Sequence, residues 1–149
     1  MVVEITRRGA ARSYPTAALR KVAVELLGQL DQKQAELSIA LVGDTEMQPL
    51  NGKYRGKKKT TDVLSFGVEE QPATGAKLLG DVIISVEQAC RQARERNHSL
   101  RSEMVTLLIH GMLHLLGYDH EGSARRAKIM FGLERKLASH LCERGLLRL

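Results

Sequence analysis

Three histidines with a spacing suited to metal binding lie in the stretch HGMLHLLGYDH, residues 110–120. His110 and His114 are four residues apart, so on a helix their side chains project from the same face. Gly117 is placed to end this helix in a left-handed turn, after which the chain can bring His120 beside the pair. Neutral imidazole is a preferred zinc ligand, and three protein ligands leave a fourth position for water. The spacing therefore predicts a zinc site with the open position that catalysis requires.

The other titratable residues around this stretch have less specific roles. Asp119 and Glu121 flank His120, and each is either a partner that orients an imidazole or a solvated loop carboxylate. The remaining histidines, His98 and His140, fall near the expected ends of helices, where a positive charge is favourable. We expect both of these histidines to be structural.

The residue after the first histidine bears on the class of substrate. A zinc-protease helix carries glutamate there as the general base, whereas this chain has Gly111. The missing carboxylate disfavours a peptidase. Because glycine has no side chain, we hypothesise that a phosphate or sugar approaches the helix closely at this position.

The charge of the chain favours a polyanionic partner. Its net charge is +6, and the densest basic cluster falls in a predicted loop and comprises Lys53, Arg55, Lys57, Lys58 and Lys59. Phosphate contacts supply most of the affinity of proteins for nucleic acids. Aromatic residues are only 3% of the chain, which disfavours an extended stacking platform of the kind found in single-strand-binding proteins. A nucleic acid held mainly through its phosphates is the partner that best fits this net charge and this aromatic content.

The length and patterning of the chain predict one α+β domain spanning residues 1–149. We expect a small mixed sheet of about four strands, over residues 2–6, 37–42, 62–68 and 78–85, packed with about five helices. The helices are expected at 15–30, 44–50, 85–97, 99–117 and 123–142, three of them capped by Ser85, Ser99 and Ser123. The His-rich helix bears the metal site.

The sequence predicts a protein that stays in the cytoplasm. Its first residues have no apolar stretch typical of a signal peptide, and no apolar run approaches the ~18 residues of a membrane span. The two cysteines, Cys90 and Cys142, show no metal-binding or redox spacing, which fits a reducing compartment.

Three stretches together resemble the bacterial YbeY family. They are LNGKYRGKKKTTDVLSF (50–66), LGDVIIS (79–85) and HGMLHLLGYDH (110–120), in this order and spacing. The family consists of metal-dependent endoribonucleases implicated in ribosomal RNA maturation and ribosome quality control. The resemblance implies a small sheet flanked by helices, with His110, His114 and His120 as zinc ligands in a basic cleft. It also implies a catalytic role for Arg55, the arginine of the Asn-x-x-Tyr-Arg element.

The sequence departs from the family pattern at two positions. The family usually has proline before the Thr-Asp pair and after Ser-Phe, where this chain has Thr60 and Gly67. These replacements loosen the loop and the strand exit, but they leave the expected ligands intact.

The leading hypothesis is a zinc-dependent, single-strand-specific endoribonuclease acting in 16S ribosomal RNA 3′-end maturation and ribosome quality control. Arg55 suits a phosphate because its guanidinium is planar and always charged, and Lys57, Lys58 and Lys59 are expected to follow the RNA backbone. Either a zinc-activated water or the 2′-hydroxyl of the RNA can attack the phosphorus, and the sequence leaves both routes open.

The partners implied are ribosomal RNA, the small ribosomal subunit and its assembly factors, with one zinc ion, no membrane and no small-molecule cofactor. Two other functions compete with this hypothesis. One is a non-catalytic ribosome assembly factor in which zinc holds the loop after Gly117. The other, less favoured, is a zinc metalloprotease.

Overall fold

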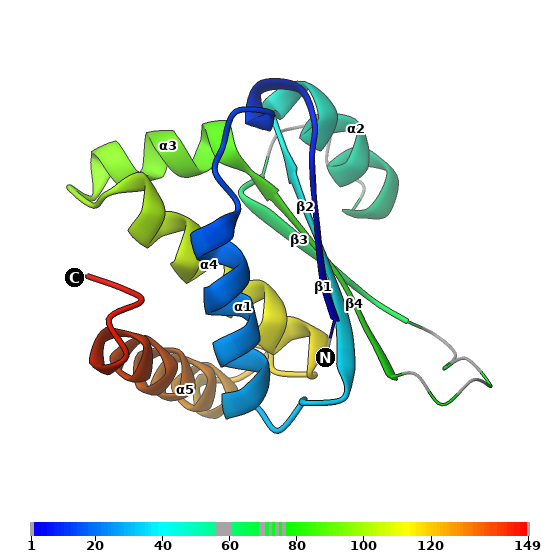
Figure 1. Cartoon of the computed structure of the whole chain (residues 1–149), viewed down its shortest axis with the longest axis vertical. Coiled ribbons are helices and arrows are strands. Elements are labelled where there is room, and N and C mark those ends of the chain that lie inside the picture. The colour runs from blue at the N-terminus through cyan, green and yellow to red at the C-terminus, as the bar shows by residue number, and fades with distance from the viewer. Residues whose placement is uncertain are drawn as a thin grey trace.

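The computed structural model (Figure 1) describes residues 2–55, 61–68, 71, 73, 75 and 77–148, with the backbone alone for residues 54 and 55. The described strands are β1 (Val2–Arg7), β2 (Ala35–Val42), β3 (Val63–Gly67) and β4 (Lys77–Ser85). The described helices are α1 (Ala17–Gln29), α2 (Asp44–Arg55), α3 (Val86–Glu95), α4 (Leu100–Leu115) and α5 (Ala124–Glu143), with a short 3-10 turn, η1, at Gly9–Ala11. The predicted α+β class, with four strands and five helices, is confirmed.

The strands form one mixed sheet in the order β1-β2-β4-β3. Strand β2 pairs in parallel with β1 and β4, whereas β3 pairs antiparallel with β4, placing Ser65 opposite Val82. This pairing places β3 at one edge of the sheet formed by the described strands.

The main core lies between one face of the sheet and helix α4. Alternate residues of β2 and β4 point into it, and α4 is apolar nearly all round, as expected for a buried helix. Helices α1, α3 and α5 pack around α4 on the same side of the sheet (Figure 1). The largest buried side chains of this core include Leu26, Leu27, Ile39, Ile84, Met104, Leu108, Met112 and Met130.

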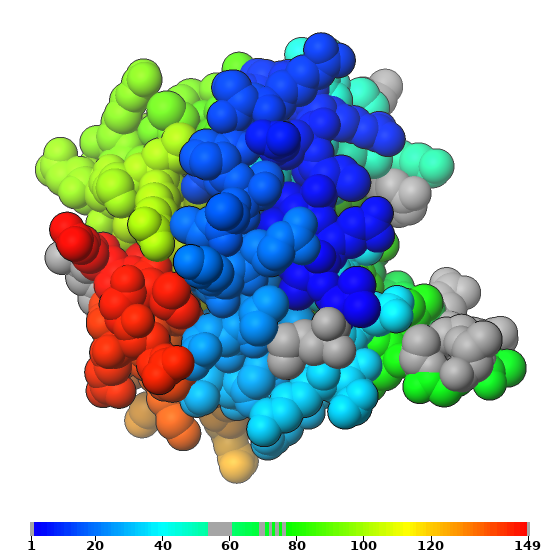
Figure 2. All heavy atoms as spheres, in the orientation of Figure 1, coloured from blue at the N-terminus to red at the C-terminus, as the bar shows by residue number. Residues whose placement is uncertain are grey.

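Helix α5 closes the core against α1. The C-terminal part of α5 and the α1 segment lie side by side on the surface shown in Figure 2. His140 of α5 contacts Glu25 of α1 through Nε2 and Oε1 at 2.7 Å. His140 therefore lies in a contact between two helices, apart from the histidine stretch at 110–120.

The predicted helix starts at three serines are confirmed. The hydroxyl oxygens of Ser85, Ser99 and Ser123 each accept a hydrogen bond from the backbone N–H three residues further on, at 3.2, 3.0 and 3.0 Å. These bonds satisfy amides that have no partner inside the helix. Local capping chemistry thus fixes where α3, α4 and α5 begin.

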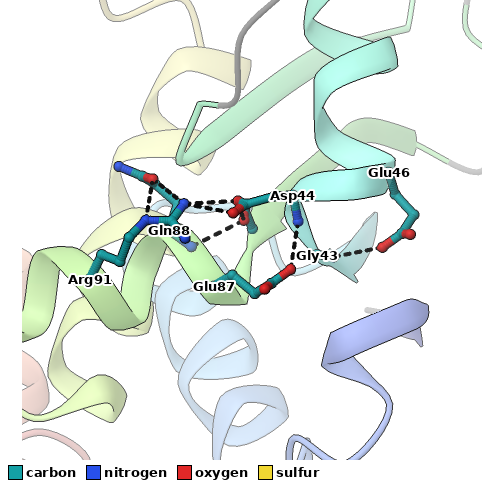
Figure 3. Close-up of polar contacts among 7 residues, drawn as sticks. Gly43, Asp44, Glu46, Glu87, Gln88 and Arg91 are labelled. Carbon is teal, nitrogen blue, oxygen red and sulfur yellow. Dashed lines mark hydrogen bonds and ion pairs between the residues drawn. The ribbon is translucent and has the colours of Figure 1, made fainter.

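The predicted end of the second helix at Leu50 is wrong, because α2 continues through Pro49 to Arg55. Its N-terminus is held by two carboxylates, since Glu46 accepts from the Gly43 N–H at 2.8 Å and Glu87 of α3 accepts from the Asp44 N–H at 2.9 Å (Figure 3). A proline inside a helix removes one hydrogen bond and crowds the carbonyl four residues before it, and the tertiary contacts of α2 offset this cost.

An ion pair joins the same helix start to α3. The Arg91 Nη2 atom lies 2.8 Å from Asp44 Oδ2, and the Ser85 hydroxyl donates to Asp44 Oδ1 at 3.0 Å (Figure 3). On the other face of the sheet, Met47 of α2 is buried in a second apolar cluster with Val42 and Leu64. Helix α2 is therefore anchored at its N-terminal end, and its far end leads to Arg55.

Candidate metal centre

The structure brings the three histidines of the 110–120 stretch together. His110 Nε2 lies 2.9 Å from His114 Nε2, and one ring nitrogen from each of the three residues lies within 4.8 Å of the others. Gly117 has a φ of +91°, and the Tyr118 N–H donates to the Leu113 carbonyl at 3.0 Å. The predicted left-handed turn is confirmed, and it returns the chain toward the last turn of α4.

The surroundings of the cluster fit a metal ion. The Nδ1 atom of His120 is buried, with no hydrogen-bond partner among the described residues. An unpaired buried polar atom costs free energy, and a cation coordinated by the cluster removes or offsets such a cost. Burial, followed by the nearby His110 and His120 rings, lowers the pKa of His114. The lowered pKa favours neutral imidazole, the form that binds zinc.

The cluster faces a cleft of about 790 Å³. Strand β3 forms one wall of the cleft, and the end of α4 with the following loop forms the other. The described lining residues are Asp62, Val63, Leu64, Ser65, Phe66, His110, His114, Gly117, Tyr118, Asp119, His120 and Glu121. The volume is typical of a ligand site, so a bound metal ion would lie next to space for a substrate.

A carboxylate from α5 contacts the cluster, and sequence analysis did not identify it. Glu134 Oε1 lies 3.3 Å from His110 Nδ1, with side-chain exposures of 20% and 25%. An ionised carboxylate only accepts, so this contact places the proton on Nδ1 and leaves the Nε2 lone pair of His110 for a metal. Glu134 is 24 residues from His110, so no local spacing signalled the contact.

The two acidic residues beside His120, Asp119 and Glu121, do not make the kind of contact that Glu134 makes with a histidine ring of the cluster. Asp119 Oδ1 accepts a hydrogen bond from the Glu121 N–H at 2.9 Å, and this bond is the main cause of the lowered pKa of Asp119. Asp119 therefore remains ionised and orders the turn that carries His120. Glu121 is exposed in the same turn.

The hypothesis that Gly111 gives substrate access to the helix is wrong. A Cβ atom on Gly111 would lie 2.7 Å from Val82 Cγ1 and 3.1 Å from Ser65 Oγ, so this position faces the sheet. The Ser65 hydroxyl also donates to the Gly111 carbonyl at 2.9 Å. Glycine permits close packing of α4 on β3 and β4, and the same packing leaves no room for a glutamate at this position.

Asp62 is a further cleft residue that the sequence analysis did not single out. Its Oδ1 accepts from the Val63 N–H at 2.8 Å, and its Oδ2 accepts from Gln92 Nε2 of α3 at 3.2 Å. The sequence signal that could have identified Asp62 is its position directly before β3, within the TTDVLSF block. These two bonds hold the Asp62 carboxylate in place in the lining of the cleft.

Comparison with known proteins identifies the family. The sequence model described as Endoribonuclease YbeY matches residues 4–142, nearly the whole chain. The chain belongs to the YbeY family. The resemblance inferred from the three sequence stretches is thereby confirmed, and membership in a family of endoribonucleases makes this chain an enzyme of the RNA-hydrolase class.

Relatives of the YbeY family cover most of this chain. Endoribonuclease YbeY of Sulfurihydrogenibium sp. is 45% identical over 84% of this chain and 83% of its own length. Endoribonuclease YbeY of Syntrophotalea carbinolica is 40% identical over 95% of this chain and 97% of its own length. The solution structure of TM1509 from Thermotoga maritima is similar, with a TM-score of 0.64, 28% identity and coverage of 91% of this chain and 86% of that one.

The predicted RNA-contacting residues of this YbeY-family chain lie beyond what the structure describes. Lys57, Lys58 and Lys59 lie outside the described residues, as does the side chain of Arg55. Their roles stay predictions.

In the described part of the chain, no helix combines the length and apolar character needed to cross a membrane.

Proposed function

We propose that this YbeY-family chain is a zinc-dependent, single-strand-specific endoribonuclease that acts in 16S ribosomal RNA 3′-end maturation and ribosome quality control. The observation that carries the proposal is the convergence of three imidazoles on one point at a cleft. The relatives' description as endoribonucleases supports RNA as the substrate. Residues 1–149 would act as a single domain in the cytoplasm, on small-subunit RNA and together with assembly factors.

The three histidines would hold the zinc ion. His110 can offer Nε2 because Glu134 contacts its Nδ1, and the lowered pKa of His114 keeps that ring neutral. When bound, zinc supplies a Lewis acid for a phosphoryl oxygen and lowers the pKa of a coordinated water. The donor set of three imidazoles suits zinc better than magnesium or calcium, which prefer oxygen ligands.

The rest of the chain would position the RNA and balance its charge. Arg55 would contact the phosphate undergoing cleavage, and Lys57, Lys58 and Lys59 would contact flanking phosphates. Position 111 supplies no general base, because it is glycine, and its packing against Val82 and Ser65 leaves no room for a glutamate. This packing weighs against the metalloprotease alternative. Cyclic-phosphate ends on the RNA products would indicate attack by the 2′-hydroxyl, and their absence would indicate attack by water.

The test combines metal analysis with RNA cleavage by purified variants. We expect about one zinc ion per chain in the wild type, with loss of both zinc and cleavage in His114→Ala. Arg55→Ala should retain zinc and lose most cleavage. His98→Ala is the matched control, because His98 is exposed and lies outside the cluster. It should retain both properties.

Two outcomes would refute the proposal. Full RNA cleavage by a zinc-free, folded His114→Ala protein would exclude the metal centre as the active site. Normal ribosomal RNA processing in cells that carry only His114→Ala would favour the assembly-factor alternative, in which cleavage is not the function.

A further inference from the structure

An exposed aromatic ring lies beside the metal centre on helix α5. The Phe131 side chain is 49% exposed, and its ring centroid is 6.3 Å from that of His120, with 31° between the ring planes. Of the phenylalanine and tyrosine side chains that the structure describes, only Phe131 is exposed. Core packing therefore does not account for this ring, which lies beside His120, a member of the histidine cluster.

Basic side chains share the face of α5 that presents Phe131. Lys128 and Arg135 are three residues before and four residues after Phe131, so they lie on the same side of the helix, and both are exposed. The Arg126 guanidinium lies near the loop after His120, with Nη1 4.0 Å from the place of a Cβ on Gly122. The ring thus shares one side of α5 with two exposed cations, Lys128 and Arg135, and with Glu134, which contacts His110.

An aromatic ring between cations matches the chemistry of a single-stranded nucleotide. A base offers an apolar face for stacking, and the adjacent phosphates carry the negative charge. A base in a duplex is already stacked and paired, so its face is not available to a protein ring. The low aromatic content disfavours an extended stacking platform, but one ring suffices for one base.

We propose that Phe131 stacks on an unpaired base of the RNA next to the phosphate at the metal centre, while Lys128 and Arg135 contact the neighbouring phosphates. The proposal rests on the endoribonuclease function proposed above. It assigns part of the preference for single strands to one side chain, because only an unpaired base can reach the ring.

The first test is spectroscopic and uses the absence of tryptophan from this chain. Phe131→Trp introduces a single tryptophan at the proposed contact. Ile129→Trp is the matched control, because Ile129 is 52% exposed and two residues away, so it faces a different side of α5. A short single-stranded oligonucleotide with 2′-O-methyl and phosphorothioate groups, which resist cleavage, is titrated into the zinc-loaded proteins.

Strong quenching of the tryptophan at 131, with little quenching at 129, is expected. Binding of the oligonucleotide, measured independently by anisotropy of a label on the RNA, without quenching at 131 would overturn the proposal. Equal quenching at both positions would also overturn it, because it would show no preference for the face beside His120.

The second test measures affinity and strand preference. Stacking on an aromatic side chain changes affinity by about fivefold to a hundredfold per base, so Phe131→Ala and Phe131→Leu should weaken binding by a factor in this range. Phe131→Tyr should retain affinity, since it keeps the ring. Ile129→Ala should bind RNA as the wild type does, and zinc content should be unchanged in all of these variants.

The outcomes separate this inference from the proposed function. If the wild type neither binds nor cleaves RNA, both proposals fail. If the wild type cleaves single-stranded RNA and Phe131→Ala binds it equally well, only the stacking contact is refuted. The ratio of affinities for single-stranded and duplex RNA should fall in Phe131→Ala, whereas loss of affinity for both forms in equal proportion would contradict the assigned role.

Discussion

The contact between Glu134 and His110 makes a quantitative prediction about zinc affinity. Glutamine in place of Glu134 keeps the size of the side chain and an oxygen acceptor, but it removes the charge. A hydrogen bond to a charged group is worth about 1 kcal/mol more than a neutral one, which corresponds to roughly a fivefold change in affinity. Glu134→Gln should therefore weaken zinc binding about fivefold.

Removing the acceptor altogether should have a larger effect. Loss of a hydrogen-bond partner of a ligating histidine typically costs about tenfold to a hundredfold in metal affinity. The two side chains are 25% and 20% exposed and the atoms are 3.3 Å apart, so we expect Glu134→Ala near the lower end of this range. Neither variant removes a ligand, so both should still bind one zinc ion at saturation.

The structure contains a matched control for this experiment. His140 and Glu25 form a similar contact at 2.7 Å, with exposures of 24% and 25%, away from the histidine cluster. Glu25 also pairs with Arg144 Nε at 3.4 Å, so Glu25→Gln should destabilise the metal-free protein at least as much as Glu134→Gln and leave zinc affinity unchanged. Competition with a chromophoric chelator measures the affinity, and urea denaturation of metal-free protein measures the stability.

Two results would refute this reasoning. Equal zinc affinity in the wild type and Glu134→Ala would show that the carboxylate does not orient His110 for a metal. A similar loss of zinc affinity in the Glu25 and Glu134 variants would show that the effect comes from general destabilisation of α5.

Three further predictions follow from contacts elsewhere in the fold. Gly111→Ala should lower the free energy of unfolding, as measured by urea denaturation. Crowding of the new methyl group against Val82 costs about 1–3 kcal/mol, which outweighs the gain of about 1 kcal/mol in helix propensity. Burial raises the pKa of Tyr14, and the charge of Arg101 opposes this rise. The buried, protonated Tyr14 therefore contributes its full stability below the ordinary tyrosine pKa, and this contribution is lost as pH rises through the pKa of the folded state. Tyr14→Phe should show a smaller alkaline loss of stability in urea titrations. Arg91→Ala should cost only about 0.2–1 kcal/mol, because the arginine is 45% exposed, and should leave zinc content unchanged by metal analysis.

Much of the fold and of the candidate site could be predicted from the sequence because the signals are local. The caps at Ser85, Ser99 and Ser123 act on backbone groups three residues away, and strand alternation and helical spacing are likewise properties of neighbouring residues. The spacing of His110 and His114 and the turn at Gly117 belong to the same class of signal. They were sufficient to place three imidazoles together.

The sequence was less informative where a residue's role depends on a partner far along the chain. The second helix passes Pro49 because Glu87 caps it from α3 and Met47 is buried on the sheet. The general tendency of proline to end a helix takes neither contact into account, so the prediction from sequence made this helix too short. The end of this helix matters for the site because Arg55 is its last residue.

Residue types and spacing by themselves therefore determined the candidate metal ligands, the helix starts and the α+β class. Only the tertiary structure decided that Gly111 packs on Val82 rather than opening toward substrate, and that Glu134 contacts His110. It also decided that Phe131 lies exposed beside His120. The physical reason is the same in each case: these contacts depend on how α4 packs against the sheet and α5, which is a property of the whole core and not of neighbouring residues.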